Sequence, residues 1–188
     1  MSACASRTRR CRRALRPPAF AWYAAVPAPE VESFLGLGGN LGDVATTLEA
    51  ALCELTADGA VRLVRASSAY RTPPWGLTEQ PDFINRCALV ATTLGPRELL
   101  QRALQVEQAF GRVRDRMSRF GPRPLDIDLL TYGKLVIDEP GLVLPHPRLF
   151  ERAFVLVPLA EIAPGREIAG RRIEDALAAV DAAEIVRL

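Results

Sequence analysis

The sequence contains few of the side chains that build the commonest catalytic and metal sites. Lys134 is its only lysine, and no G-x-x-x-x-G-K-[ST] segment occurs, which excludes a Walker-type phosphate-binding loop. His146 is its only histidine, and no Ser/His/Asp or Cys/His arrangement is present. The cysteines form no C-x-x-C pair, so we expect reduced, structural thiols in a reducing compartment at Cys4, Cys11, Cys53 and Cys87.

Long apolar runs are also missing, and no segment reaches the length needed to cross a bilayer. We therefore expect a cytoplasmic protein with no membrane partner. The formal charge of +2 is unevenly distributed, because six of the 24 basic residues lie within the first sixteen positions. Residues 31–188 carry 18 basic and 21 acidic side chains, and this mildly acidic balance argues against a nucleic-acid partner.

A chain of 188 residues with 49% apolar content predicts one domain, which we place at residues 32–188. Residues 1–31 show no apolar periodicity, and we favour an extension that is a disordered tail or a wrongly assigned start. An organellar transit peptide and a weak secretory signal are the alternatives. The arginine-rich start suits a transit peptide, but three prolines interrupt any helix there, at Pro17, Pro18 and Pro27.

Apolar periodicity in the body predicts the order β-α-β-β-α-β. The expected strands are residues 33–38, 60–70, 82–93 and 124–132, and the expected helices are residues 44–55 and 96–110. This order is typical of a ferredoxin-like, split βαβ fold of the α+β class, a three-layer sandwich whose antiparallel sheet carries both helices on one face. Added C-terminal segments follow, with an apolar run at 153–159 and a final helix containing Ile173, Leu177 and Val180.

The segment Gly121–Asp128 (GPRPLDID) carries the sharpest chemical signal. Strand alternation places Asp126 and Asp128 on one face, and Leu125, Ile127 and Leu129 on the other. Two carboxylates at this spacing can reach a pair of divalent ions, as two-metal phosphate chemistry requires. Because no histidine or thiol accompanies them, Mg²⁺ is the expected metal. The alternative is two solvated acids on the wet face of an antiparallel strand.

An arginine cluster precedes these acids, at Arg112, Arg114, Arg116, Arg119 and Arg123. A carboxylate pair beside arginines resembles a metal–polyphosphate site, in which metals cover some phosphate oxygens and guanidinium groups cover others. We expect some of the five arginines to be only solvated loop residues.

Two further features leave alternatives open. Gly36-x-Gly38 lacks the third glycine of a dinucleotide-binding turn, because Leu41 stands there. The turn fits close backbone approach to a flat ligand, with Asn40 supplying an amide, or simply a tight strand-to-helix connection. His146 is held between two prolines, and a structural and a catalytic role both remain open.

Six successive motifs resemble those of the 2-amino-4-hydroxy-6-hydroxymethyldihydropteridine diphosphokinase family, over about residues 34–165. They are FLGLGGNLGD (34–43), YRTPPWG (70–76), QPDFIN (80–85), GRVR (111–114), GPRPLDID (121–128) and LPH (144–146). The resemblance implies a ferredoxin-like fold and ordered binding of MgATP and then the pterin. It also implies transfer of diphosphate from ATP to the hydroxymethyl oxygen of 6-hydroxymethyl-7,8-dihydropterin, with release of AMP, in folate biosynthesis.

The resemblance also implies site residues, position by position. Asp126 and Asp128 would hold two Mg²⁺ ions, and Arg112 and Arg123 would join them as catalytic residues. ATP, the co-substrate, would be bound by Glu107, Arg112, Arg114, His146 and Arg152. The pterin pocket would comprise Gly38, Thr72, Pro73, Pro74, Trp75, Phe83, Asn85, Phe120 and Phe154. The family usually has tryptophan where Phe120 stands, and serine is common at Gly39. ATP and the pterin are the expected partners of a monomer.

Two other functions are compatible with this fold class. A ferredoxin-like nucleic-acid-binding module would need exposed aromatic residues and a basic sheet face. Asp126 and Asp128 occupy the expected free face instead, and they would repel phosphate without a metal. A catalytically inactive homologue is the other alternative, and the intact D-x-D pair together with Arg123 argues against it.

Overall fold

The computed structural model describes residues 29–113 and 121–188. The predictions for residues 1–28, for Arg114 and for Phe120 therefore lie outside the described residues. The first half of the described chain contains β1 (Val31–Gly39), α1 (Val44–Leu55), β2 (Val61–Ala66), β3 (Tyr70–Thr72), β4 (Phe83–Thr92), α2 (Pro96–Ala109) and β5 (Asp126–Leu129). The second half contains β6 (Ile137–Glu139), β7 (Leu142–Leu144), the 3₁₀ turn η1 (Leu149–Glu151), α3 (Ala153–Ile162), β8 (Glu167–Ile168), β9 (Arg171–Arg172), α4 (Ile173–Leu177) and β10 (Val186–Arg187).

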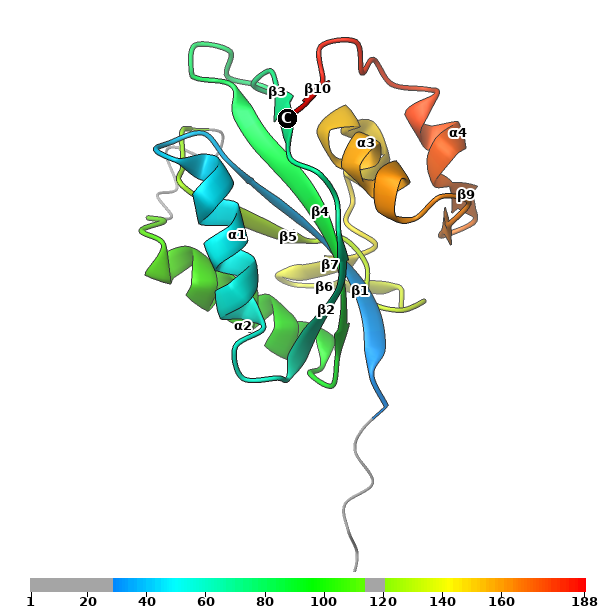
Figure 1. Ribbon diagram of the computed structural model, residues 1–188. Coiled ribbons are helices and arrows are strands. Elements are labelled where there is room, and N and C mark those ends of the chain that lie inside the picture. The colour runs from blue at the N-terminus through cyan, green and yellow to red at the C-terminus, as the bar shows by residue number, and fades with distance from the viewer. Residues whose placement is uncertain (1–28, 114–120) are drawn as a thin grey trace, which may run out of the picture.

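The architecture is α+β, built on an antiparallel sheet (Figure 1). Its strands run in the order β10-β3-β4-β1-β5, and β2 also pairs with β4. The two long strands β1 and β4 lie at the centre, paired from Val31 opposite Thr92 to Gly39 opposite Ile84. Strand β5 therefore lies at one edge, where one side of its backbone has no strand partner among the described residues.

Two strand predictions need correction. The strand expected at residues 60–70 is two strands, because regular pairing with β4 stops after Ala66 and resumes at Tyr70; a bulge between Leu63 and Arg65 also lies within β2. At Ser67 a side chain replaces one of the backbone hydrogen bonds between the strands. Its hydroxyl accepts from the Cys87 amide at 2.9 Å, and its backbone amide donates to the Cys87 carbonyl. The strand expected at residues 124–132 is only β5, because the amides of Leu130 and Thr131 both turn toward the Phe34 carbonyl.

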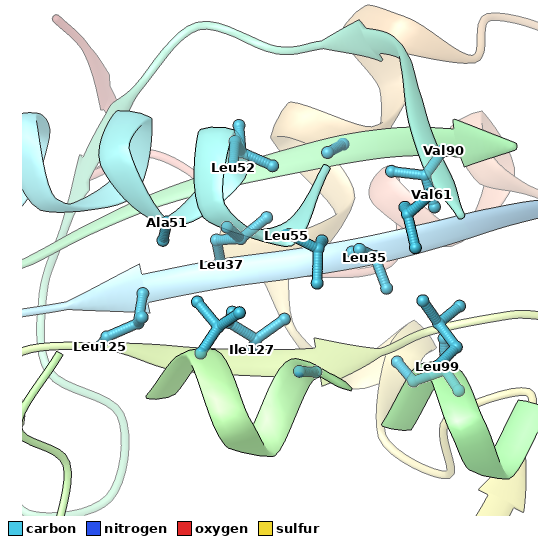
Figure 2. Close-up of a cluster of buried hydrophobic side chains, with 14 of the residues drawn as sticks. Leu35, Leu37, Ala51, Leu52, Leu55, Val61, Val90, Leu99, Leu125 and Ile127 are labelled. Carbon is cyan, nitrogen blue, oxygen red and sulfur yellow. The ribbon is translucent and has the colours of Figure 1, made fainter. Parts of the chain in front are cut away.

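One face of the sheet packs against α1 and α2 through an apolar core. Figure 2 shows leucines of β1 and α1 meeting Leu125 and Ile127 beside α2. Both helices begin at sequence signals: Asp43 caps α1 by accepting from the Thr46 amide, and Pro96 stands in the first turn of α2. The expected pair of helices on one face is thus present.

The opposite face is covered in part by α3 and α4, which Figure 1 shows in orange and red. The apolar run at residues 153–159 forms most of α3, whose leucines pack on Phe34, Leu89 and Leu130. The final helix is shorter than expected, since α4 ends at Leu177 before Val180. None of the helices within the described ranges is both long and apolar enough to span a membrane.

Candidate functional site

Two acids and two glycines face each other across neighbouring strands. Asp126 and Asp128 are half-buried on β5, whereas Ile127 and Leu129 are buried in the core, which confirms the predicted alternation. In the β1–β5 register, Gly38 lies opposite Asp126 and Gly36 lies opposite Asp128. Glycine at these positions leaves space beside each carboxylate. Sequence reasoning missed Gly36, although a G-x-G with strand period opposite a D-x-D was the available signal.

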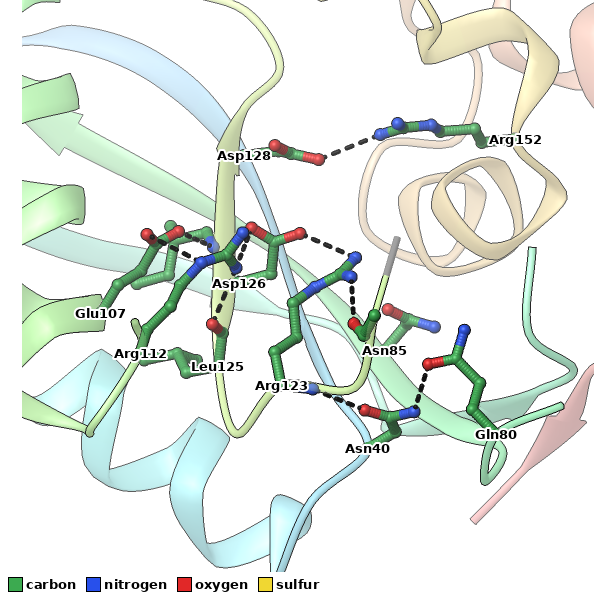
Figure 3. A network of polar contacts seen from close by, with 12 residues as sticks. Asn40, Gln80, Asn85, Glu107, Arg112, Arg123, Leu125, Asp126, Asp128 and Arg152 are labelled. Carbon is green, nitrogen blue, oxygen red and sulfur yellow. Dashed lines mark hydrogen bonds and ion pairs between the residues drawn. The ribbon is translucent and has the colours of Figure 1, made fainter. Parts of the chain in front are cut away.

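Asp126 is held by two arginines from different segments (Figure 3). Arg112, which follows α2, contacts the Asp126 carboxylate with Nη1, and the same nitrogen donates to the Leu125 carbonyl at 2.9 Å. Arg123, which precedes β5, places Nη2 at 3.0 Å from the other carboxylate oxygen of Asp126. Two of the five clustered arginines therefore converge on the first predicted metal ligand.

Glu107 positions Arg112 and the edge strand. Its side chain is 1% exposed, and its Oε1 accepts from the Ile127 amide at 2.8 Å, on the side of β5 that lacks a strand neighbour. Its Oε2 lies 3.6 Å from Nε of Arg112. Burying this carboxylate is tolerable because a backbone amide and a guanidinium both face it. Glu107 thus links α2, β5 and Arg112.

Asp128 is paired from the opposite layer. Arg152, at the start of α3, places Nη1 at 3.0 Å from Oδ2 of Asp128, as Figure 3 shows. Its guanidinium also lies over two rings, at 5.3 Å from the centroid of Trp75 and 5.5 Å from that of Phe154. Each acid of the D-x-D pair therefore has its own arginine partners.

A pocket with about 670 Å³ of atom-free space, including the part open to solvent, lies beside these charges. Eleven of the predicted site residues line it: Gly38, Thr72, Pro73, Trp75, Phe83, Asn85, Arg123, Asp126, Asp128, Arg152 and Phe154. Four others that the structure describes do not line it: Pro74, Glu107, Arg112 and His146. Lining residues that sequence reasoning missed are Gly36, Leu37, Arg86, Cys87 and Val155.

The pocket walls suit a flat heterocycle. Phe83 and Phe154 come from β4 and α3, and the Trp75 ring meets Phe154 edge-on at 6.5 Å. Asn85 is buried and also lines the pocket, and its amide donates to the Thr72 hydroxyl at 2.7 Å. A Cβ at Gly38 would lie 2.1 Å from Oδ1 of Asn85, so only glycine leaves this amide in place.

Asn40 connects two loops through side-chain and backbone hydrogen bonds. Its amide nitrogen donates to Gln80 at 3.0 Å and to the Pro81 carbonyl at 3.1 Å. Its Oδ1 accepts from the backbone amide of Arg123 at 2.8 Å, and the backbone amide of Asn40 donates to the Arg123 carbonyl. Because this side chain is already committed to protein partners, it ties the loop before β4 to the loop before β5. Of the two alternatives for this turn, these bonds favour the tight strand-to-helix connection, and Asn40 does not line the pocket.

His146 is half-buried and lies near Asp128, whose charge acts on the imidazole. Its backbone amide donates to the Leu130 carbonyl at 2.8 Å, and its Nδ1 accepts from the Arg148 amide at 3.1 Å, so the neutral ring carries its proton on Nε2. Burial lowers the pKa of the imidazole; the charge of Asp128 opposes this shift, and those of Arg152 and Arg148 add to it.

The cysteines in the described ranges, Cys53 and Cys87, are free thiols. Burial raises the pKa of the Cys87 thiol, which keeps it protonated and unreactive at the pocket wall.

The donor set at the pocket fits magnesium better than other metals. Asp126 and Asp128 offer hard oxygen ligands, and no group of three or more His, Cys, Asp or Glu suited to a metal occurs in residues 29–113 and 121–188. Mg²⁺ is commonly held by one or two carboxylates together with substrate phosphates, and not by an all-protein cage. Two carboxylates beside a pocket with arginines match that mode of binding.

Residues 34–164 match the family model described as 7,8-dihydro-6-hydroxymethylpterin-pyrophosphokinase. The chain belongs to this family. A relative from Methylorubrum extorquens, a 2-amino-4-hydroxy-6-hydroxymethyldihydropteridine pyrophosphokinase, is 48% identical over 83% of this chain and 98% of its own length. The Bacillus subtilis protein of the same name is 42% identical over 69% of this chain and 77% of its own length. The matched range includes every described residue that lines the pocket.

Solved structures support the fold independently. The crystal structure of Plasmodium falciparum HPPK-DHPS, wild type with pteroate, superposes with a TM-score of 0.64 at 13% identity, over 80% of this chain. The chain spans only 44% of that larger chain. At this identity the likeness concerns the fold, and family membership rests on the sequence matches.

Proposed function

We propose that this chain transfers diphosphate from ATP to the hydroxymethyl oxygen of 6-hydroxymethyl-7,8-dihydropterin, releasing AMP, as a step of folate biosynthesis. One observation carries the proposal. The D-x-D acids, with Arg123 and Arg152, line the same pocket as the two phenylalanines and the buried Asn85 amide. A charged half for polyphosphate and an aromatic half for a flat ring are thus adjacent, as a transfer between those two substrates requires.

We propose that Asp126 and Asp128 bind two Mg²⁺ ions together with the ATP phosphates. When bound, the ions would neutralise phosphate charge and orient the transferred group. Arg112 is anchored by Leu125 and Glu107, so its guanidinium is suited to holding the polyphosphate in the ground state. Arg123 is anchored because its Nη1 donates to the Gly121 carbonyl at 3.0 Å. We assign it the role of stabilising the negative charge that develops as the bond to the α-phosphate breaks.

For the pterin, we propose stacking between Phe83 and Phe154, with Asn85 reading the amide edge of the ring. Thr72 fixes the orientation of that Asn85 amide. The Arg123 guanidinium lies 5.0 Å from the centroid of the Phe83 ring, and that of Arg152 lies over Phe154. Attack by a primary alcohol on phosphorus depends on positioning and charge neutralisation more than on a strong base. We place Arg152 and His146 on the ATP side, as their proximity to Asp128 supports.

We further propose that β1, α1, β2 together with β3, β4, α2 and β5 form a ferredoxin-like, split βαβ unit within a domain at residues 32–188. In this description β2 and β3 count as one interrupted strand. The strand order β3-β4-β1-β5 and the placement of α1 and α2 on one face support this description. That the domain acts as a cytoplasmic monomer stays a prediction from the sequence.

The reaction can be tested by its nucleotide product. The chain is incubated with MgATP and hydroxymethyl-dihydropterin, and the nucleotides are separated by ion-exchange chromatography. We expect AMP in amounts equal to the diphosphorylated pterin, none when the pterin is omitted, and none after chelation of Mg²⁺. ADP as the product would contradict the proposal and indicate an ordinary kinase.

A further inference from the structure

Arg148 is a cation that the proposed reaction does not use. It stands two residues after His146, and its guanidinium lies 5.2 Å from the centroid of the Trp75 ring. Arg112, Arg123 and Arg152 each have a carboxylate partner. Arg148 has no such partner among the residues that the structure describes. Its side chain is nevertheless half-buried against an aromatic ring.

Trp75 connects this cation to the pocket. It lies in the segment between β3 and β4 and lines the pocket together with Thr72 and Pro73. Its ring is contacted from the α3 layer by Arg148, by Arg152 at 5.3 Å and by the edge of Phe154. Trp75 is 40% exposed, and these contacts with Arg148, Arg152 and Phe154 contribute to its position.

The two guanidiniums on this ring differ in what else holds them. Arg152 is drawn to its place by Asp128, at 3.0 Å. Arg148 makes no ion pair with residues 29–113 or 121–188, and its guanidinium lies over the Trp75 ring. Tryptophan gives the most favourable cation–π contact. The backbone of Arg148 is fixed independently, because its amide donates to Nδ1 of His146. The Arg148 side chain can therefore stabilise the position of the Trp75 ring.

We propose that Arg148 is a positioning residue that holds Trp75 against the α3 layer and so sets one wall of the pocket for the flat heterocycle. The identity of that heterocycle rests on the proposed function, whereas the contact between Arg148 and Trp75 does not. Because Arg148 acts through a pocket wall and not through the acids, its loss should weaken pterin binding and leave the chemical step unchanged.

The sequence offers a direct probe, since Trp22 and Trp75 are the only two tryptophans. In a Trp22→Phe background, Trp75 is the sole emitter. We expect Arg148→Met to raise acrylamide quenching of Trp75 and shift its emission. In steady-state assays it should raise KM for the pterin by roughly three- to tenfold, with kcat and KM for ATP unchanged. Arg148→Lys, which keeps a cation, should recover part of the loss.

Arg171 provides the matched control, because its guanidinium lies 5.1 Å over Phe150, a ring that does not line the pocket. Arg171→Met should change neither Trp75 quenching nor pterin KM. Unchanged quenching and unchanged KM in Arg148→Met would overturn the proposal, as would a changed Trp75 signal without any change in pterin affinity. The fluorescence measurement needs no substrate, so absence of AMP formation in the parent chain would count against the proposed function alone.

Discussion

The two faces of β5 differ in what they contribute to the molecule. On one face Ile127 is 2% exposed and packs, with Leu125 and Leu129, into the dry core beneath α1 and α2. On the other face the side chains of Asp126 and Asp128 are 20% and 35% exposed and meet arginines from three segments. Alternation along four residues thus separates the side chains that stabilise the sheet from those that carry charge.

This separation predicts which mutations should change stability and which should change catalysis. The apolar face gains stability from burial and close packing, so its loss should be seen in the free energy of unfolding. The charged face is compensated by ion pairs that remain accessible at the pocket, so its loss should be seen mainly in catalysis. Neighbouring residues on one strand therefore make a matched pair of tests.

The largest expected effect is that of Asp128→Ala on turnover. Losing one of the two proposed metal-binding carboxylates should lower kcat by at least about a hundredfold, since the Mg²⁺ ions would lose one of the two protein side chains that hold them beside the phosphates. The melting temperature should change little, because this side chain lies outside both apolar cores. Steady-state rates of AMP formation with calorimetry on the same sample measure both quantities. Turnover within a few-fold of the parent would show that Asp128 is a solvated acid and not a metal ligand.

The adjacent residue should behave in the opposite way. Ile127→Ala removes a fully buried side chain of the core and should lower the free energy of unfolding by about 2–4 kcal/mol. At temperatures where the variant stays folded, kcat should remain within a few-fold of the parent, because the β5 backbone and both acids are unchanged. Urea denaturation gives the stability, and a selective loss of kcat with full stability would break the comparison between the two faces.

Arg123 allows a test, within the charged face, of whether an arginine acts on turnover or on ATP binding. If it stabilises charge that develops in the transition state, Arg123→Ala should lower kcat by roughly ten- to a hundredfold and weaken ATP binding only modestly. Arg123→Lys should recover little, because a point charge does not replace a planar fork. Pre-steady-state kinetics and ATP titration separate the two quantities. Weakened ATP binding with unchanged kcat would make Arg123 a ground-state anchor and shift the catalytic role to Arg112.

The smallest expected effect distinguishes the two glycines that face the acids. A Cβ at Gly38 would meet Oδ1 of Asn85 at 2.1 Å, whereas one at Gly36 would meet only Leu130 at ordinary contact distance, 3.6 Å. Gly38→Ala should therefore raise KM for the pterin by roughly tenfold by displacing the Asn85 amide, and Gly36→Ala should change it less than about twofold. Equal effects of the two substitutions would show that the amide does not read the pterin edge.

Much of the secondary structure could be predicted because its signals are local. The period of 3.6 in residues 44–55 and 96–110 gave helices close to the observed bounds of α1 and α2. The interruption between β2 and β3 could not be predicted, because the Ser67 hydroxyl that replaces a ladder bond is recognised only once Cys87 lies opposite. A strand-like run does not reveal where its partner's register shifts.

For the site residues, too, some features could be predicted from local motifs and others only from the tertiary structure. The motifs that resemble the pterin pyrophosphokinase family named the candidates, and eleven of those line one pocket. Their individual roles stay predictions until the variants are measured. Trp75 was implied by the motif as a pterin residue, but nothing in the sequence linked it to Arg148, which lies in a different layer of the fold.

By itself, then, the sequence determined the alternation of β5, the main helices and the family to which the chain belongs. These depend on residues within a few positions of each other or on motifs that can be read in order. Only the tertiary structure decided which arginine meets which acid, and that Asn40 bonds to Arg123 across 83 positions of the chain. Such pairings arise because packing of the layers brings distant segments within hydrogen-bond reach, and no local pattern encodes that proximity.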